Sequence, residues 1–283
     1  MCISASPSAW IGWIAAASKA VDASAKALGR LGVRTADRML ERAAGALPLM
    51  AAGRMWRIAV SGLLDVEADL MANRRWARRR AAGSSATVFE DKRECDAAHR
   101  AAGPASPFAA DFDPIELDDD VDLDRFARLG DDWLRLRPLL PAMRTRAALR
   151  FRYTGRHRAE GVYHPAHRNI AVDPRHPSVL VHELMHHLDH TTAGHDLSLE
   201  PPFRPILDAY REGLDRTRIT GDPERWLAPT EVFARAGELW VSRRGGDGSA
   251  LLDTAAEYAT RWDYAPFKGM ETDIDRVFDA LFA

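Results

Sequence analysis

The sequence predicts a helix-dominated α+β protein in which a small sheet is preceded by a mainly helical N-terminal region. Residues 8–82 are rich in Ala, Leu, Arg and Met, which favours helices, and they lack the alternation typical of strands. Segments with strand-like patterns follow between residues 149 and 172, and helical patterns then continue to residue 282. Because helices and strands occupy separate stretches of the chain, an α+β arrangement is expected.

The composition is typical of a soluble globular protein with one large domain or two ordinary ones. Of 283 residues, 46% are hydrophobic and 28% are charged, and the net charge of −2 gives no overall basic field that would favour nucleic acid. The two cysteines, Cys2 and Cys95, indicate a reducing compartment such as the cytoplasm, and they are too few for a cysteine-rich zinc site. A metal ion would therefore need His, Asp or Glu ligands.

Two apolar stretches near the N-terminus are candidate membrane segments. Trp10–Ala17 is too short to cross a bilayer, and no basic segment precedes it as in a signal peptide. The second stretch, Ala46–Val66, is interrupted by Arg54, Arg57 and Asp65 and is expected to be a buried or amphipathic helix. No membrane span is predicted, whereas secretion as an effector stays open.

Residues 1–82 are expected to form a helical region with breaks near Gly29–Gly32 and near Pro48. This region ends in Arg74–Arg80, where five arginines flank Trp76. One interpretation is a patch that binds nucleic acid, an anionic surface or a partner protein. The other, which we favour, is a solvated helix end whose cations complement the helix dipole.

Residues 83–122 are expected to be a linker followed by an acidic segment. Gly, Ser and Pro are frequent in residues 83–110, which predicts an irregular surface segment. Asp111–Asp124 contains eight acidic residues and no basic ones, but it lacks the glycine and closing glutamate of an EF-hand loop. We expect a solvated face or pairing with the arginine run.

Residues 123–283 are expected to form the second structural region. Its predicted strand Leu149–Tyr153 and the hairpin Gly161–His164 with Asn169–Val172 form the small sheet. Ser178 is the expected N-cap of the helix that follows the hairpin. The predicted helices are Leu123–Leu136, Pro141–Ala148, Ser178–His190, Glu231–Arg243, Ser249–Trp262 and Thr272–Phe282.

An HExxH motif at residues 182–186 lies in the predicted helix Ser178–His190. Four residues are slightly more than one helical turn, so His182 and His186 project from the same face and can bind one Zn²⁺. The helix is otherwise apolar, so both histidines would be buried and would need partners. The alternative is that they are core histidines satisfied by backbone carbonyls.

A catalytic zinc site needs a third protein ligand and an open position for water. Glu231, which opens a predicted helix 45 residues after His186, is the expected third ligand. Glu238 lies two turns further along the same face and is either the next candidate or an outer partner. His190 would lie about 12 Å along the axis from His182, too far to share the ion, and His195 lies beyond the helix.

These residue types predict metal-assisted hydrolysis of a peptide bond. Zinc lowers the pKa of its bound water, and Glu183 is the expected general base that takes the proton. The developing oxyanion needs a further donor, for which Tyr264 is the candidate and Tyr163 and His164 are alternatives. Ordinary packing is the competing interpretation for all three.

Two neighbours of the motif have expected supporting roles. Asp189 could orient His186 by accepting the N–H of its non-ligating ring nitrogen. His187 is expected to point away from the metal, as a plain surface or interface residue. A glycine and a third histidine would stand where this chain has Asp189 and Thr192 in the elongated HExxHxxGxxH pattern, which is therefore excluded.

The segments HELMHHLD and PTEVFARAGELW resemble those of zincin-superfamily zinc metallopeptidases with a glutamate as third ligand. More narrowly, residues 149–283 are similar to a metallopeptidase-like domain of large polyvalent proteins of phages and mobile elements. The resemblance implies a zincin-like α+β domain, with His182, His186 and Glu231 as zinc ligands and Glu183 as catalytic base. Ala265 departs from the contiguous Tyr-Pro pair expected there, and nothing is implied for residues 1–148.

Three other functions stay open from the sequence. The fold could persist as a catalytically silent binding or structural module that acts through its helical, basic N-terminal region, although Glu183 argues for a working site. A secreted toxin or effector protease would share the chemistry and differ in destination. A different zinc hydrolase, such as a deacetylase, has less support from the motifs.

Overall fold

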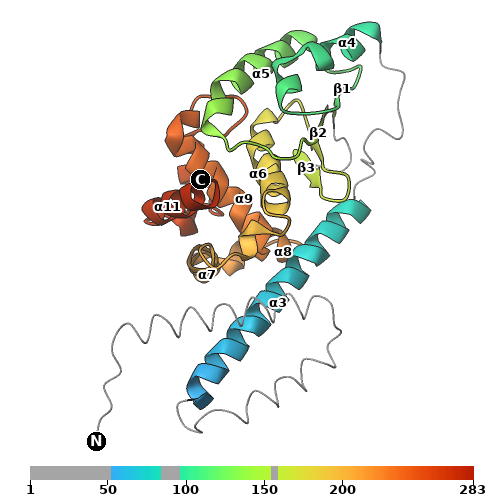
Figure 1. Cartoon of the computed structure of the whole chain (residues 1–283). Helices are drawn as coiled ribbons and strands as arrows, with labels where there is room; N and C mark the ends of the chain where they lie inside the picture. The colour runs from blue at the N-terminus through green and yellow to red at the C-terminus, as the bar shows by residue number, and fades with distance from the viewer. Residues whose placement is uncertain (1–51, 84–95, 154–158) are drawn as a thin grey trace, which may run out of the picture. The chain divides into compact units, whose positions relative to one another are not determined.

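The computed structural model describes residues 52–83, 96–153 and 159–283 (Figure 1). The chain divides into two compact units, Met1–Leu64 and Asp65–Ala283. Only residues 52–64 of the first unit are described, so the predicted breaks near Gly29–Gly32 and Pro48 lie outside the described residues. The second unit begins inside helix α3 (Ala52–Gly83) and contains the predicted linker and acidic segment together with the region from residue 123 onward.

A mixed sheet of four strands lies in this second unit. Its order is β1-β2-β4-β3, and the strands are Ile115–Leu117, Ala148–Phe151, Asn169–Val172 and Gly161–His164 in that order. Strands β1, β2 and β4 are parallel, whereas β3 is antiparallel to β4, which confirms the predicted hairpin. The predicted strand at residues 149–153 is confirmed as β2, shifted slightly toward the N-terminus.

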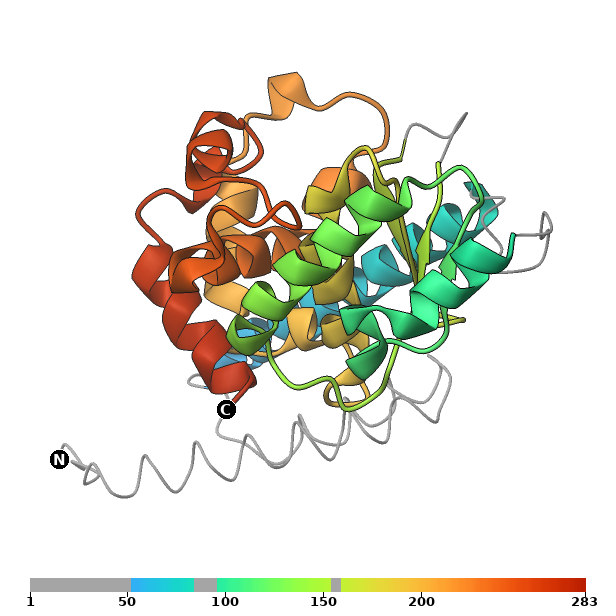
Figure 2. The ribbon, with the colours of Figure 1, turned by 90° about the horizontal axis from the view of Figure 1, so that it is seen from above.

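Helices provide most of the second unit, so the predicted helix-dominated α+β class is confirmed. The α-helices after α3 are α4 (Ala97–Ala105), α5 (Leu123–Leu136), α6 (Leu180–Thr191), α7 (Arg204–Gly213), α8 (Glu224–Leu227), α9 (Pro229–Val241), α10 (Ala255–Thr260) and α11 (Glu271–Leu281). Helix α5 has the predicted bounds, and α6, α9 and α11 match predicted helices to within two residues at each end. Figure 2 shows α4 and α11 at opposite sides of the unit.

One predicted helix, Pro141–Ala148, is wrong. The backbone groups of this segment are used by other elements: Ala147 accepts a hydrogen bond from Asp113 N–H, and Thr145 O is bonded to the His187 ring. Ala148 already pairs with Asn169 in the sheet. Tertiary pairing has therefore overridden the local helix propensity.

Three other local expectations need correction. Residues 97–110 are not linker, because Asp96 caps α4 by accepting the His99 N–H, and a 3₁₀ turn, Pro107–Ala110, follows. The predicted helix Ser249–Trp262 shortens to α10, which starts at the Thr254–Glu257 capping box. Ser178 is not an N-cap, because it lies within a 3₁₀ turn, Pro177–Val179, that runs directly into α6.

The hydrophobic core lies between one face of the sheet and the helices. Alternate strand residues share a face, so Leu149 and Phe151 of β2 project with Ile170 and Val172 of β4. On the β2 side this face meets α5 through aromatic contacts, with the Phe151 ring 5.3 Å from that of Phe126. On the β3 side it meets α6. One face of α6 therefore packs on the sheet, and another face of α6 packs against α9.

The charged segments pair locally. In the acidic segment, Asp111 binds Arg137 and Asp118 binds Arg150, both at 2.6 Å, so these carboxylates do not pair with the arginine run. In that run, Arg75 binds Glu224 at 2.6 Å, while Arg74 and Arg78 are exposed on α3. Among the described residues, no helix has the length and apolarity needed to span a membrane.

Candidate metal centre

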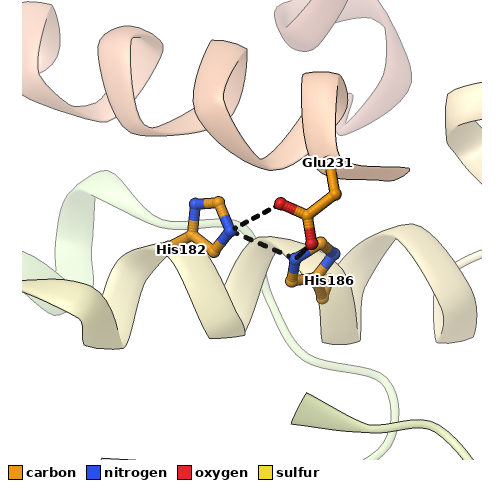
Figure 3. Close-up of side chains that lie close together, drawn as sticks. All are labelled: His182, His186 and Glu231. Carbon is orange, nitrogen blue, oxygen red and sulfur yellow. Dashed lines mark hydrogen bonds and ion pairs between the residues drawn. The ribbon is translucent and has the colours of Figure 1, made fainter. Parts of the chain in front are cut away.

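Helices α6 and α9 pack side by side and carry the candidate site between them (Figure 1). Gly237 of α9 allows the close approach, since a Cβ added there would lie 2.6 Å from the Met185 sulfur of α6. Helix α6 presents His182 and His186 to α9, and Glu231 descends from the first turn of α9 to meet them (Figure 3). The HExxH spacing and the early position of Glu231 in its helix together create the cluster.

Three side chains converge on one point. The Nε2 atoms of His182 and His186 lie 3.2 Å apart. The Glu231 carboxylate lies 3.5 Å from the first nitrogen through Oε2 and 3.3 Å from the second through Oε1. Zinc bonds of about 2.0–2.1 Å at tetrahedral angles place neighbouring ligand atoms roughly 3.3–3.4 Å apart. The three donors therefore fit a tetrahedral zinc ion with one further position for water or substrate.

The outward nitrogen of each histidine is also bonded. His182 Nδ1 lies 2.9 Å from Glu238 Oε2, and His186 Nδ1 lies 2.9 Å from the Thr230 hydroxyl. With Glu238 as acceptor, His182 Nδ1 carries the proton and Nε2 keeps its lone pair for a metal. Such outer partners fix ring orientation and tautomer in metal sites. Glu238, the alternative third ligand, thus lies on the far side of His182 from the cluster.

The charges of the cluster favour a cation. Burial alone would raise the pKa of Glu231, but His186 and His182 outweigh it and hold that pKa well below its ordinary value. Burial alone would lower the pKa of His182, but the carboxylates of Glu238 and Glu231 raise it to about 10. Two buried carboxylates around two imidazoles therefore stabilise positive charge at this point, carried by a proton or by a metal ion.

Arg235 lies next to Glu231, one helical turn further along α9. Its Nη2 is 3.4 Å from Glu231 Oε2, and its Nε is 3.5 Å from Asp263. Arg235 is 4% exposed, so its guanidinium is a buried cation between the two carboxylates of Glu231 and Asp263 and does not form a surface ion pair. Arg235 therefore contacts Oε2 of Glu231, the same oxygen that faces His182 Nε2.

Glu183, the predicted general base, is 1% exposed and lies on the sheet side of α6. It packs against the edge strand, because a Cβ added at Gly161 of β3 would lie 3.2 Å from Glu183 Oε1. The same Cβ would lie 2.6 Å from Val179 Cγ1 and 3.0 Å from Glu183 Cγ, so a side chain at residue 161 would force these neighbours to move. Gly161 therefore provides the space in which Glu183 sits beside the histidine pair.

The three candidates for the oxyanion donor have different surroundings. Tyr264 is buried, and its hydroxyl donates to Glu238 Oε2, so it supports the outer partner of His182. The Tyr163 hydroxyl lies 3.2 Å from His187 Nδ1, and its side chain also lines a recess beside His186. His164 is the next residue along β3 and projects from the opposite face of the sheet.

The neighbours of the motif differ partly from expectation. His187 is not a surface residue: it is 0% exposed and packs toward the sheet, where its Nε2 lies 2.7 Å from Thr145 O. Asp189 does not bind His186 directly. It accepts the Ser198 N–H at 2.6 Å and is bonded to Thr230, so it reaches His186 through that hydroxyl. His190 and His195 bind Asp196 and Glu200 and lie outside the cluster.

Two residues of α3 take part in the site and were missed from the sequence. The Trp76 indole donates from Nε1 to Glu231 Oε1 at 2.5 Å, and Asn73 accepts the Thr230 N–H at 3.0 Å. The tryptophan stood out only as the centre of the arginine run. Its separation from Glu231 by 155 residues leaves no local signal of the contact.

Comparisons with family models, with curated proteins and with solved structures find no match for this chain.

Proposed function

We propose that the protein is a zinc-dependent metallopeptidase that hydrolyses a peptide bond in a protein substrate. The observation that carries the proposal is the convergence of His182 Nε2, His186 Nε2 and the Glu231 carboxylate, each within 3.5 Å of a neighbour in the set. Two imidazoles and one carboxylate with an open fourth position are a donor set of catalytic zinc sites. Among the described residues, this is the cluster whose ligand atoms lie close enough to share an ion.

The chain's own residues would divide the work. A bound zinc ion would supply Lewis acidity at the substrate carbonyl and at water. Glu183 would accept the proton of the attacking water on a carboxylate oxygen and then deliver it to the leaving amine. Glu238, held by Tyr264 and Tyr258, would keep the His182 ring in the ligating orientation.

The sheet supports a peptide as substrate. Strand β3 is at the edge of the described sheet and lies against α6. An extended peptide that paired with this edge would run along the strand that holds Gly161 against Glu183. Strand β3 would then bind the peptide next to Glu183, the predicted general base.

Metal content is the first test. Zinc measured by elemental analysis should be one per chain in the wild type and much lower in Glu231→Ala, since a ligand is removed. Glu212→Ala, at an exposed position on α7, is the matched control and should keep its zinc. Absence of zinc from the wild type after incubation with the ion would overturn the proposal.

Activity is the second test. Glu183→Gln should bind zinc as the wild type does and should cleave an unstructured protein such as casein about 10²–10⁴ times more slowly. Equal cleavage rates would refute the role of Glu183. Zinc binding without cleavage of any peptide in a diverse library would favour the silent binding module, in which the same fold holds the metal for stability alone.

A further inference from the structure

Helix α3 contributes directly to the surroundings of the glutamate ligand. The Trp76 indole nitrogen can only donate, and it donates to Oε1 of Glu231, the oxygen that faces His186. The other oxygen, Oε2, faces His182 and receives the Arg235 contact. Two donors on opposite oxygens fix the rotation of the carboxylate about its last bond. The plane of the ligand is therefore set in part by a residue outside α6 and α9.

Asn73, one turn before Trp76, binds the start of the helix that carries Glu231. Helix α9 has no side-chain cap of its own, and Asn73 Oδ1 accepts the N–H of Thr230 in its first turn. The same amide donates from Nδ2 to Asp196 at 3.0 Å and to Ser198 at 3.2 Å. Asn73 is 5% exposed and thus acts as a buried cap supplied by a distant segment.

The position of Thr230 extends this contact to a histidine ligand. Its N–H is held by Asn73, while its hydroxyl lies 2.9 Å from His186 Nδ1. Residues 73 and 76 of α3 therefore reach two of the three candidate ligands, one through Thr230 and one directly. A shift of α3 would release both.

Polar contacts hold α3 in this place. Asp69 binds Arg204 and Arg211, each at 2.8 Å, and Arg75 binds Glu224 at 2.6 Å. By contrast, the large apolar side chains of Val66 and Met71 are 44% and 37% exposed. Hydrogen bonds and ion pairs, rather than a broad apolar face, therefore carry much of the docking of this segment.

We propose that residues 69–76 of α3 are a structural part of the metal centre, with Trp76 and Asn73 as positioning residues for the ligand Glu231. The inference rests on the proposed metal site and adds that zinc binding and the docking of α3 are coupled. Coupling of two binding equilibria is reciprocal, so α3 strengthens zinc binding and zinc strengthens the docking of α3 by the same factor.

Zinc affinity tests the first half. Trp76→Phe keeps an aromatic ring and removes the N–H, and its zinc Kd, measured by competition with a chelator, should rise about 10–100-fold. Asn73→Ala should weaken zinc binding in the same direction. Arg78→Gln is the matched control, because it removes an exposed arginine of the same helix whose side chain donates to the Arg74 carbonyl within α3, and its Kd should stay within about twofold of wild type.

The outcomes separate the two proposals. A metal-free urea unfolding curve for each variant distinguishes lost positioning from lost folding, since a purely structural role would lower metal-free stability and leave the Kd of the folded protein unchanged. Equal Kd values for Trp76→Phe, Asn73→Ala and wild type, with zinc lost in Glu231→Ala, would overturn the coupling and leave the metal site standing. A wild type without zinc would overturn the metal site itself.

Limited proteolysis tests the reciprocal half. Trypsin cleaves after arginine, and Arg74 and Arg75 lie exposed within residues 69–76, with Arg78 exposed just beyond them on α3. Zinc should slow cleavage after these residues in the wild type and should have no effect in Glu231→Ala. Cleavage after Arg276, which is exposed on α11, serves as the internal control. Equal slowing at Arg276 would show general stabilisation by zinc and refute a specific link to α3.

Discussion

The sheet side of the molecule and the α6–α9 interface are buried to a similar degree, yet their side chains differ in kind. Beside the sheet, Phe108, Phe126 and Phe151 are 0–3% exposed and contact one another ring to ring. Between α6 and α9, Glu231 and Glu238 are each 3% exposed and bind histidines, tyrosines and a buried arginine. The aromatic cluster beside the sheet is apolar, whereas the interface between α6 and α9 is rich in charged and polar side chains.

This difference separates the region expected to stabilise the fold from the region proposed to carry the chemistry. Aromatic burial contributes free energy in proportion to the area removed from water. Buried charges cost desolvation that their pairing only partly offsets, and apolar replacements of similar volume are often as stable or more stable. The buried carboxylates and histidines between α6 and α9 therefore support the proposed metal site more than they support the stability of the fold. Substitutions in the aromatic cluster should therefore lower mainly the free energy of unfolding, and substitutions between α6 and α9 should weaken mainly zinc binding.

The largest stability effect is expected in the aromatic cluster. Phe151→Ala removes a fully buried ring that lies 5.6 Å from Phe108 and 5.3 Å from Phe126, so the free energy of unfolding should fall by about 3–5 kcal/mol. Urea denaturation of the metal-free protein measures this, and Phe151→Leu, which removes less buried volume, should lose less than Phe151→Ala. The zinc Kd of the folded variant should not change. A large change in that Kd would show that the two regions are not separate.

Glu238→Ala should reverse the pattern, with a large effect on the metal and a smaller one on folding. It removes the acceptor of His182 Nδ1 and of the Tyr264 hydroxyl, and loss of such an outer partner weakens metal binding by about 10–100-fold. Stability should fall by about 1–3 kcal/mol because buried donors are left unpaired. Chelator competition beside urea denaturation gives both numbers. Glu238→Gln, which keeps one acceptor oxygen, should lose less zinc affinity, and an unchanged Kd in both variants would contradict the assignment.

His187 sharpens the comparison because it shares α6 with the candidate ligands His182 and His186 but faces the sheet. His187→Ala leaves Thr145 O and the Tyr163 hydroxyl without their ring partner, so unfolding free energy should fall by about 1–3 kcal/mol. Zinc affinity should stay within about twofold of wild type. A loss of affinity as large as that of Glu238→Ala would mean that the two faces of α6 act as one unit.

Hydrophobic periodicity and residue spacing were sufficient to predict the parts of this fold that depend on local sequence. The α5 helix follows from its apolar pattern between Asp122 and Pro138, and the β3–β4 hairpin follows from two short strands around a turn. The cluster of His182, His186 and Glu231 follows from a fixed helical spacing and one early carboxylate on a later helix. Helical geometry is rigid enough for such arguments to reach side chains.

The parts that sequence could not give depend on contacts between distant segments. Residues 141–147 have helical propensity, but their carbonyls are used by Asp113 and His187. His187 resembles a surface residue until the sheet is placed against α6. The role of Trp76 depends on how α3 docks, which no periodicity encodes. The arginines around Trp76 favoured a solvated helix end, because the sequence pattern shows the charges but not the residue that Trp76 contacts in the fold.

The smallest expected effect concerns a polar exception on the sheet side. His99 of α4 has both ring nitrogens next to acceptors, with Nδ1 2.9 Å from Asp96 Oδ2 and Nε2 2.8 Å from Val121 O, and this arrangement favours the protonated ring. Burial alone would lower the pKa of His99, but the Asp96 carboxylate and the Val121 carbonyl outweigh it and raise the pKa above 6.5.

A raised folded-state pKa means that the contribution of His99 to stability is complete below pH 6.5 and is lost as the pH rises through the folded value. The Tm difference between wild type and His99→Gln should therefore shrink between pH 6 and pH 9, by at most about 2–4 °C because solvent screens the pair. Differential scanning calorimetry across this range measures it. Since His99 lies apart from the candidate metal ligands, adding zinc should raise the Tm of both proteins without changing the difference between them. A Tm difference that depends on zinc would show that the sheet side and the candidate metal centre are coupled.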